Sequence, residues 1–307
     1  MNEIKDIKIT KGMTVKKLTE QLAESGFQAQ HLGEAIAILK EAKQNKATTF
    51  LSFTSNMAAS GLRGIFIDLV KNRKIDVIVT SSGTIDEDLI RAKRPYLKGS
   101  FEADDAKLGK EGINRMGNIY VPNDRYEYLD DLSQELLSKI YEKHKELTPS
   151  ELIKEMGLLL ETEDSLVYWA ARNDIPIFCP GISDGSFGMQ LMFFHQKHPD
   201  FRIDVLKDFN KIIGIAMGAE KTCGIVLGGG IAKHHTIISN LMNEGFDYAI
   251  YVNSSTPYHG SLSSATTSEA KSWGKVKPDA HAITVYGDAA ILFPLLIASV
   301  DEVLDEG

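Results

Sequence analysis

The segment 224-GIVLGGGIAKHH-235 contains the pattern that decides the fold. Its apolar run at 224–227 predicts a buried strand, the glycines at 228–230 predict a turn, and the residues after them predict a helix. Glycines allow the backbone to approach a ligand closely, and the N-terminus of the following helix can hold an anionic phosphate. The triplet alone is equally typical of a tight turn, since no GxGxxG fingerprint follows any predicted strand.

The same order of apolar run, small polar residues and helix recurs along the chain. Strands are expected at 48–53, 75–79, 175–179, 224–227, 248–252 and 282–286. These runs lack polar alternation, which is typical of strands covered on both faces in a parallel sheet. Helices are expected at 14–43 in one or two pieces, at 62–71, and after the capping box Thr148-Pro149-Ser150-Glu151. We therefore predict one Rossmann-like α/β domain over 1–307, an open and mostly parallel sheet with helices on both faces.

Small polar residues stand at the predicted carboxyl end of each strand, where ligands bind in open α/β sheets. These strand tips are 54–56, 80–83, 183–186, 228–230, 253–255 and 287–288. If they meet at one edge, they form a long hydrogen-bonding cleft suited to a dinucleotide. The Gly-rich, aperiodic segment 99–124 predicts a long loop that covers or completes the site.

Composition narrows the class of protein. The chain has 307 residues, 43% of them hydrophobic, a net charge of -8 and a pI near 5.5, so nucleic-acid binding through a basic face is not expected. Cys179 and Cys223 lie in apolar runs without CxxC spacing, which indicates neither a zinc site nor a disulfide framework. The charged N-terminus does not resemble a signal peptide, and the longest apolar run, 291–300, is too short to span a bilayer. We expect a soluble cytoplasmic protein.

Titratable side chains at the strand tips have two interpretations. His234 and His235 are adjacent on a predicted helix and face different directions, so at most one is expected to reach a given ligand. Glu87, Asp184 and Asp288 follow predicted strands beside glycine. Each carboxylate could accept hydrogen bonds from ribose hydroxyls, or it could serve as a helix cap or dipole partner.

The stretch from Glu269 to Lys275 places an indole beside a lysine in a predicted loop. A free lysine, with a pKa of about 10.4, is almost fully protonated near neutral pH. Use of Lys275 as a nucleophile therefore requires desolvation or a nearby cation, and an apolar pocket walled by Trp273 could supply the desolvation. The indole could also lie against an ammonium group by cation–π attraction. Without further information, a solvated lysine near a packing tryptophan is the simpler interpretation.

Several motifs together resemble those of deoxyhypusine synthases, in family order over residues 50–295. The motifs are SNMAASGLR at 55–63, DVIVT at 76–80, DEDLI at 86–90, GINRMGN at 112–118, SDGS at 183–186, GGGIAKHH at 228–235, SEA at 268–270, SWGK at 272–275 and YGDA at 286–289.

This resemblance implies an NAD-dependent aminobutyltransferase. In the family, NAD takes a hydride from spermidine, an enzyme lysine carries the butylimine, and one lysine of translation initiation factor 5A receives it. By motif, Lys275 would form the imine, His234 would lie by the oxidised carbon, and Glu269, Trp273, Lys233 and Tyr251 would contact the polyamine. The NAD contacts would be Ser55, Asn56, Ser81, Ser82, Glu87, Asp184, Gly229, Gly230, Ser254, Ser255, Gly287 and Asp288. A homotetramer is implied, without a metal, nucleic acid or membrane partner.

The sequence also departs from eukaryotic members of that family. Met189 and Leu262 stand where those members carry acidic residues for the polyamine, His259 replaces an aspartate, and Ala59 replaces a serine. These differences favour a prokaryotic branch. They leave two alternatives open: a homospermidine synthase-like enzyme that uses putrescine as acceptor, and a catalytically inactive, NAD-binding regulatory paralogue.

Overall fold

The computed structural model describes residues 3–300, which divide into two compact units. The first unit comprises residues 3–53, 72–79 and 209–300, and the second comprises 54–71 and 80–208. The chain passes from one unit to the other several times, and α11 (Val205–Gly218) has residues in both. The single domain expected over the whole chain stays a prediction.

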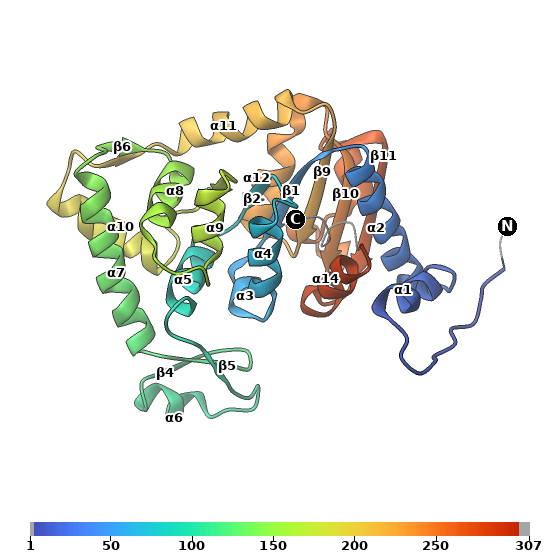
Figure 1. Cartoon of the computed structure of the whole chain (residues 1–307), viewed down its shortest axis with the longest axis horizontal. Helices are drawn as coiled ribbons and strands as arrows, with labels where there is room; N and C mark the ends of the chain where they lie inside the picture. Colours follow the sequence, from blue (N-terminus) through green and yellow to red (C-terminus); the bar gives the residue numbers. More distant parts are fainter. Residues whose placement is uncertain (1–2, 301–307) are drawn as a thin grey trace. The chain divides into compact units, whose positions relative to one another are not determined.

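The first unit contains five parallel strands in the order β11-β10-β9-β1-β2 (Figure 1). Their bounds are β1 Thr48–Phe53, β2 Val77–Val79, β9 Thr222–Leu227, β10 Phe246–Asn253 and β11 Val276–Tyr286. Every residue of β2 and β9 is buried, which agrees with the continuous apolar runs in the sequence. Phe50 of β1 packs edge-on against Phe246 of β10, with ring centroids 5.6 Å apart.

Helices cover both faces of this sheet. The helices of the first unit are α1 (Val15–Ala23), α2 (Phe27–Gln44), α12 (Gly230–Ser239), α13 (Thr267–Ser272) and α14 (Ala289–Ala298), with three short 3₁₀ segments, η1 (Leu241–Asn243), η2 (Pro257–His259) and η3 (Leu262–Ser264). Tyr248 of β10 bonds to Glu41 of α2, whereas the ring of Tyr251 lies under Lys233 of α12. Residues 248 and 251 point to opposite faces of a strand, so α2 and α12 lie on opposite sides of β10.

The second unit is mainly helical (Figure 1). Its helices are α3 (Ser55–Ala59), α4 (Leu62–Lys71), α5 (Ser82–Arg91), α6 (Asp105–Lys110), α7 (Asp124–Tyr141), α8 (Pro149–Leu159), α9 (Leu166–Arg172) and α10 (Ser186–Lys197). Its strands are β3 (Leu97–Lys98), β4 (Ile113–Met116), β5 (Ile119–Pro122), β6 (Glu146–Leu147), β7 (Ile177–Phe178) and β8 (Arg202–Ile203). The predicted capping box is present at α8, where Thr148 Oγ1 accepts from Glu151 N.

The expectation of a structureless loop over 99–124 was wrong. This segment forms α6, and β3, β4 and β5 pair as a small antiparallel sheet in the order β3-β5-β4. Arg115 of β4 holds α6 through a two-pronged ion pair with Asp105, at 2.5 and 2.7 Å. These short strands show only a weak alternation of polar and apolar residues. Their conformation therefore depends more on the strands they pair with than on their own composition.

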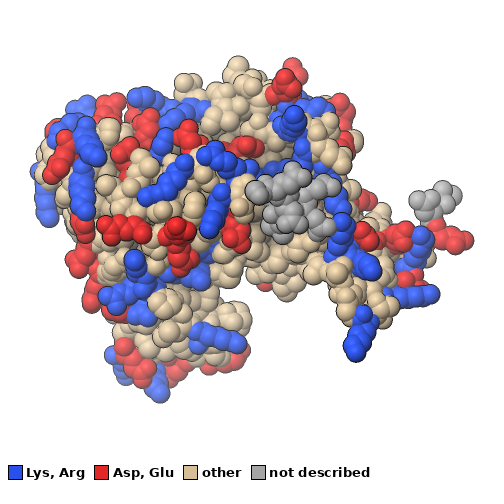
Figure 2. Space-filling view, viewed as in Figure 1, with Lys and Arg blue, Asp and Glu red and all other residues tan. Residues whose placement is uncertain are grey.

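The predicted fold class, an α/β protein with a mostly parallel sheet, is confirmed. Both cysteines are buried and free. Among residues 3–300, no helix is both long and apolar enough to cross a membrane. In Figure 2, basic and acidic side chains alternate over the visible face, with no continuous area of one sign.

Candidate active site

The glycine turn after β9 is built around Ser263 of η3. Gly228 and Gly230 have φ values of 81° and 68°, in the left-handed region that favours glycine. The amide of Gly230 donates to Ser263 Oγ at 2.9 Å. A Cβ on Gly229 would lie 2.4 Å from the Cβ of Ser263, so the turn requires glycine there because the serine approaches so closely.

The ends of β9, β10 and β11 lie side by side at one edge of the sheet. Gly228 N donates to Val252 O at 2.8 Å, and Gly287 N donates to Asn253 O at 3.1 Å. Ser254 and Ser255 follow β10 and are exposed. Asp288 caps α14, because its Oδ1 accepts from Ala290 N at 2.8 Å. Gly229 at the N-cap position of α12 has no side chain, and the amide of Gly230 is bound to Ser263 Oγ, so an anion could be received only by the amides that follow Gly230.

Lys233 of α12 is buried, with 1% of its surface exposed. Its Nζ donates to Ser263 O at 3.1 Å and Ala265 O at 2.6 Å, and it lies 4.7 Å from the centroid of the Tyr251 ring. Burial lowers the pKa of Lys233 to about 8, and the charge of Glu269 opposes that shift. Tyr251 is also buried, and its hydroxyl has no hydrogen-bond partner among the described residues.

The two adjacent histidines of α12 differ in their surroundings. Burial lowers the pKa of His234, and the charge of Lys275 lowers it further, so the imidazole is held in its neutral form. His235 stacks at 5.0 Å from Phe209, and burial lowers its pKa to about 4. The charge of Lys275 therefore acts on His234, whereas His235 packs against α11.

Lys275 lies in the short connection between α13 and β11 and is 9% exposed. Its Nζ is 5.5 Å from the centroid of the Trp273 ring, while the indole itself is 65% exposed. The backbone of Lys275 is fixed on both sides, since its N donates to Ala270 O at 3.0 Å and its O accepts from Phe246 N at 3.1 Å. Glu269, in the first turn of α13, is exposed. The first unit thus combines a buried amine, a neutral imidazole, an open indole and a carboxylate.

The other predicted cofactor residues belong to the second unit. Ser81 Oγ accepts from Ser55 N at 3.2 Å, and Ser82 Oγ donates to Ile182 O at 3.0 Å. The first bond brings together the beginnings of α3 and α5, and the second joins α5 to the segment before α10. Asn56 accepts from Thr54 Oγ1 at 2.5 Å and is exposed, as is Asp184.

Glu87 of α5 is a buried carboxyl group without a complete set of partners. It is 5% exposed, and its Oε2 has no hydrogen-bond partner among the described residues. Burial raises the pKa of Glu87 to about 7, an effect that the neighbouring Tyr96 opposes. A buried acceptor of this kind is suited to a hydroxyl donor such as that of a ribose.

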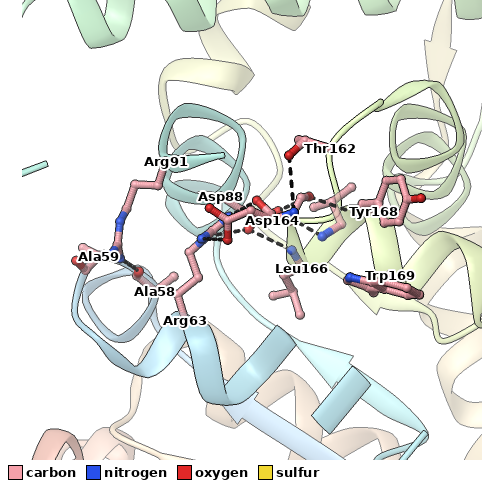
Figure 3. A network of polar contacts seen from close by, with 12 residues as sticks. Ala58, Ala59, Arg63, Asp88, Arg91, Thr162, Asp164, Leu166, Tyr168 and Trp169 are labelled. Atoms are coloured by element: carbon pink, nitrogen blue, oxygen red, sulfur yellow. Dashed lines mark hydrogen bonds and ion pairs between the residues drawn. The ribbon is translucent and has the colours of Figure 1, made fainter. Parts of the chain in front are cut away.

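A polar network holds α5 in the second unit (Figure 3). Asp88, next to Glu87, accepts from Arg63 Nε at 2.7 Å, from Ser165 Oγ at 2.6 Å, and from the amides of Leu166 and Val167 at 2.9 Å each. The guanidinium of Arg91, the last residue of α5, donates to the carbonyls of Ala58, Ala59 and Ser60 at the end of α3. The helices that carry Ser55 and Glu87 are therefore fixed to one another.

The sequence-predicted residues fall into two groups. The first unit contains Lys275, His234, Trp273, Glu269, Lys233, Tyr251, Gly229, Gly230, Ser254, Ser255, Gly287 and Asp288, and the second contains Ser55, Asn56, Ser81, Ser82, Glu87 and Asp184. Sequence reasoning missed Ser263, which contacts the glycine turn. The serine run at 261–264, close after Asn253, was the available signal.

Comparisons with known proteins decide the family. The model of the family "Deoxyhypusine synthase" matches residues 17–300. The chain belongs to the deoxyhypusine synthase family. It is 45% identical over 297 residues to a probable deoxyhypusine synthase of Thermoplasma acidophilum, with 96% of each chain covered. It is 46% identical over 290 residues to one of Methanocaldococcus jannaschii, which covers 89% of this chain and 88% of the relative.

A solved structure has the same fold. The crystal structure of a protein assigned as a deoxyhypusine synthase from Entamoeba histolytica matches this member of the family with a TM-score of 0.73. The two sequences are 26% identical, and the match covers 99% of both chains. The resemblance drawn from the sequence motifs is therefore confirmed at the level of family and fold.

Proposed function

We propose that this deoxyhypusine synthase family member transfers the aminobutyl group of spermidine, with NAD, through an imine on Lys275 to one lysine of translation initiation factor 5A. The observation that carries the proposal is the setting of Lys275, a lysine almost fully removed from water beside an indole and an imidazole. An amine must be neutral to attack a carbon, and the buried position keeps bulk water away from the attacking nitrogen.

Each unit by itself offers groups that suit part of a dinucleotide. In the first unit, the amides of α12 that follow Gly230 can receive an anionic phosphate, and Ser254, Ser255, Gly287 and Asp288 stand at the same sheet edge. In the second unit, the unpartnered Oε2 of Glu87 suits a ribose hydroxyl, with Ser55, Asn56, Ser81, Ser82 and Asp184 as further candidates. When bound, NAD would take up a hydride from the polyamine and return it to the transferred group.

His234 would accept a proton, and Lys275 would form the bond to carbon. A neutral His234 can accept a proton from the polyamine nitrogen as its neighbouring carbon is oxidised. Attack of Lys275 Nζ on the resulting C=N carbon forms the enzyme imine and releases 1,3-diaminopropane. Attack of the acceptor lysine on the same carbon then frees Lys275. Burial of Lys275 limits the access of water, which protects the imine from hydrolysis.

The polyamine would be held by charge and by an aromatic face. Glu269 supplies a carboxylate near α12 and α13, and the exposed indole of Trp273 offers its face to an ammonium group. Lys233 and Tyr251 were predicted as further polyamine contacts. We also propose the homotetramer and the cytoplasmic location that the resemblance implies.

The acceptor is tested directly with the purified protein. Labelled spermidine and NAD are incubated with the factor 5A precursor and, separately, with putrescine. We expect label on the factor, because the family match supports protein modification. Label in homospermidine with none on the factor would replace the proposal with the homospermidine synthase-like interpretation, which the absence of carboxylates at Met189 and Leu262 would then explain.

A further inference from the structure

Lys233 is more completely buried than Lys275, at 1% against 9% exposed, and its ammonium group is bound by backbone carbonyls. Its two hydrogen-bond acceptors, the carbonyls of Ser263 and Ala265, both belong to the segment that forms η3 and its end. The ring of Tyr251 covers another side of the Nζ at 4.7 Å. A buried ammonium must find such partners, because its desolvation is costly.

The segment that Lys233 holds is the connection 254–265. It begins with Ser254 and Ser255 and ends in η3, which contains Leu262. Asn253 fixes both ends, because its Nδ2 donates to Ser263 O and its Oδ1 accepts from Ser255 N at 2.9 Å. Ser255 and Ser263, near the two ends of the connection, are thus joined through one asparagine.

Ser263 transmits this arrangement to the glycine turn. Its carbonyl accepts from Lys233 and Asn253, and its Oγ accepts from Gly230 N at 2.9 Å. Its Cβ fills the space in which a side chain at position 229 would have to lie. Any movement of η3 would therefore change the position of the first amides of α12.

We infer that Lys233 is a positioning residue that sets the dinucleotide-binding turn through Ser263, in place of the direct polyamine contact expected from the sequence. The inference rests on the proposed function, because it takes the glycine turn to be part of the NAD site. It assigns to Lys233 the role of keeping that turn in the shape that binds NAD. His234 is the next residue of α12 and points in a different direction. The first part of α12 therefore carries both Lys233, which holds the glycine turn, and His234, the proposed base.

The test uses Lys233→Met, which keeps the length of the side chain and removes its donors, and Ser263→Ala, which removes the acceptor of Gly230 N. Both variants are expected to raise the Kd for NAD about tenfold. Lys275 should still form its adduct at saturating NAD, so KM for NAD changes more than kcat. Lys233 and Ser263 act through the same series of contacts, so the effects of the two substitutions should not add. The NAD affinity of the double variant should be close to that of the weaker-binding single variant.

Hydrogen exchange of the protein without ligands gives a readout that does not depend on the reaction. Amides of 254–265 and Gly230 should exchange more than tenfold faster in Lys233→Met. Lys43→Met is the matched control, because Lys43 also donates to a backbone carbonyl, that of Lys74, but lies by the beginning of β2. It should change neither NAD binding nor exchange at Gly230.

Unchanged exchange and unchanged NAD affinity in Lys233→Met, with loss of spermidine binding alone, would overturn the inference in favour of direct polyamine contact. If that variant does not fold, Ser263→Ala decides, and wild-type exchange at Gly230 together with wild-type NAD affinity would refute the inference. Failure of the wild-type protein to bind NAD would instead refute the proposed function, while the exchange of Gly230 would still report on the Lys233 contact.

Discussion

The Nζ of Lys275 lies 5.5 Å from the centre of the Trp273 ring, and the two residues differ sharply in exposure, 9% against 65%. The indole therefore forms the outer wall and the amine lies behind it. In the proposed reaction, a polyamine ammonium group arriving from solvent would meet the aromatic face before it meets the amine.

Replacement of Trp273 by alanine should weaken spermidine binding. Loss of a cation–π contact worth about 0.5–2 kcal/mol corresponds to a rise of roughly 2- to 30-fold in KM for spermidine. Trp273→Phe should recover most of the affinity, since it keeps a flat ring. Steady-state kinetics check this, with Trp169→Ala as control, because Lys71 lies 4.6 Å above Trp169 in a comparable pair. Equal effects of the two alanine variants would argue against a role for Trp273 in binding.

Replacement of His234 by alanine should slow the oxidation step by about 10²- to 10⁴-fold, the usual range for loss of a general base. Binding of NAD should stay within about twofold of wild type. Single-turnover formation of NADH, followed by absorbance, measures the first quantity and calorimetry measures the second. A collapse of NAD affinity would mean that His234 holds the cofactor instead.

The same histidine predicts a pH profile. Burial and the charge of Lys275 lower the pKa of His234, so the neutral base persists to a lower pH than a free imidazole with its pKa of about 6.5. The acid limb of the oxidation rate should therefore lie below that value. An acid limb at or above it, measured by the same absorbance assay, would contradict the assignment.

His235 should make the protein sensitive to acid. Its pKa is about 4 in the folded chain and about 6.5 when unfolded, so between these values the unfolded chain binds the extra proton. The free energy of unfolding must then fall as pH drops from about 6.5 to about 4, with a slope near 1.4 kcal/mol per pH unit from this group. His235→Gln should remove that part of the slope in urea titrations. An unchanged slope would show that the ring is solvated.

The network around Asp88 should contribute strongly to stability. Asp88→Asn leaves Arg63 without its buried partner, and the expected loss is about 3 kcal/mol in the free energy of unfolding. Asp164→Asn, at the exposed second partner of Arg63, should cost less than about 1 kcal/mol. Urea midpoints of the two variants compare them, and equal shifts would refute the distinction drawn from burial.

Local sequence patterns predicted the parallel sheet well and the small antiparallel sheet poorly. The runs predicted at 48–53 and 224–227 fall on β1 and β9, which are almost wholly buried, and the cap at Thr148 uses residues three positions apart. The strands β3, β4 and β5 are two to four residues long and are only partly buried. Their structure depends on pairing between distant residues, which no local pattern shows.

The residues of the candidate site were likewise predicted only in part. Motif and composition pointed to Lys275, Trp273 and His234, because their chemistry is rare in that combination. The contacts of Lys233 with Ser263 and Ala265 span about thirty residues, and they depend on backbone carbonyls that every residue type carries. The same holds for the orphaned oxygen of Glu87, since burial without a partner is a property of the fold.

Covalent trapping at Lys275 tests the central claim most directly. The protein is incubated with spermidine and NAD, reduced with borohydride and digested for mass spectrometry, with Lys275→Arg and Lys277→Arg in parallel. A guanidinium stays protonated and cannot form the imine, whereas the Lys277→Arg variant can keep the ion pair of position 277 with Asp247. We predict a four-carbon amine adduct on Lys275 in wild type and in Lys277→Arg, and none in Lys275→Arg. Full transfer activity in Lys275→Arg, or an adduct on another lysine, would contradict the account.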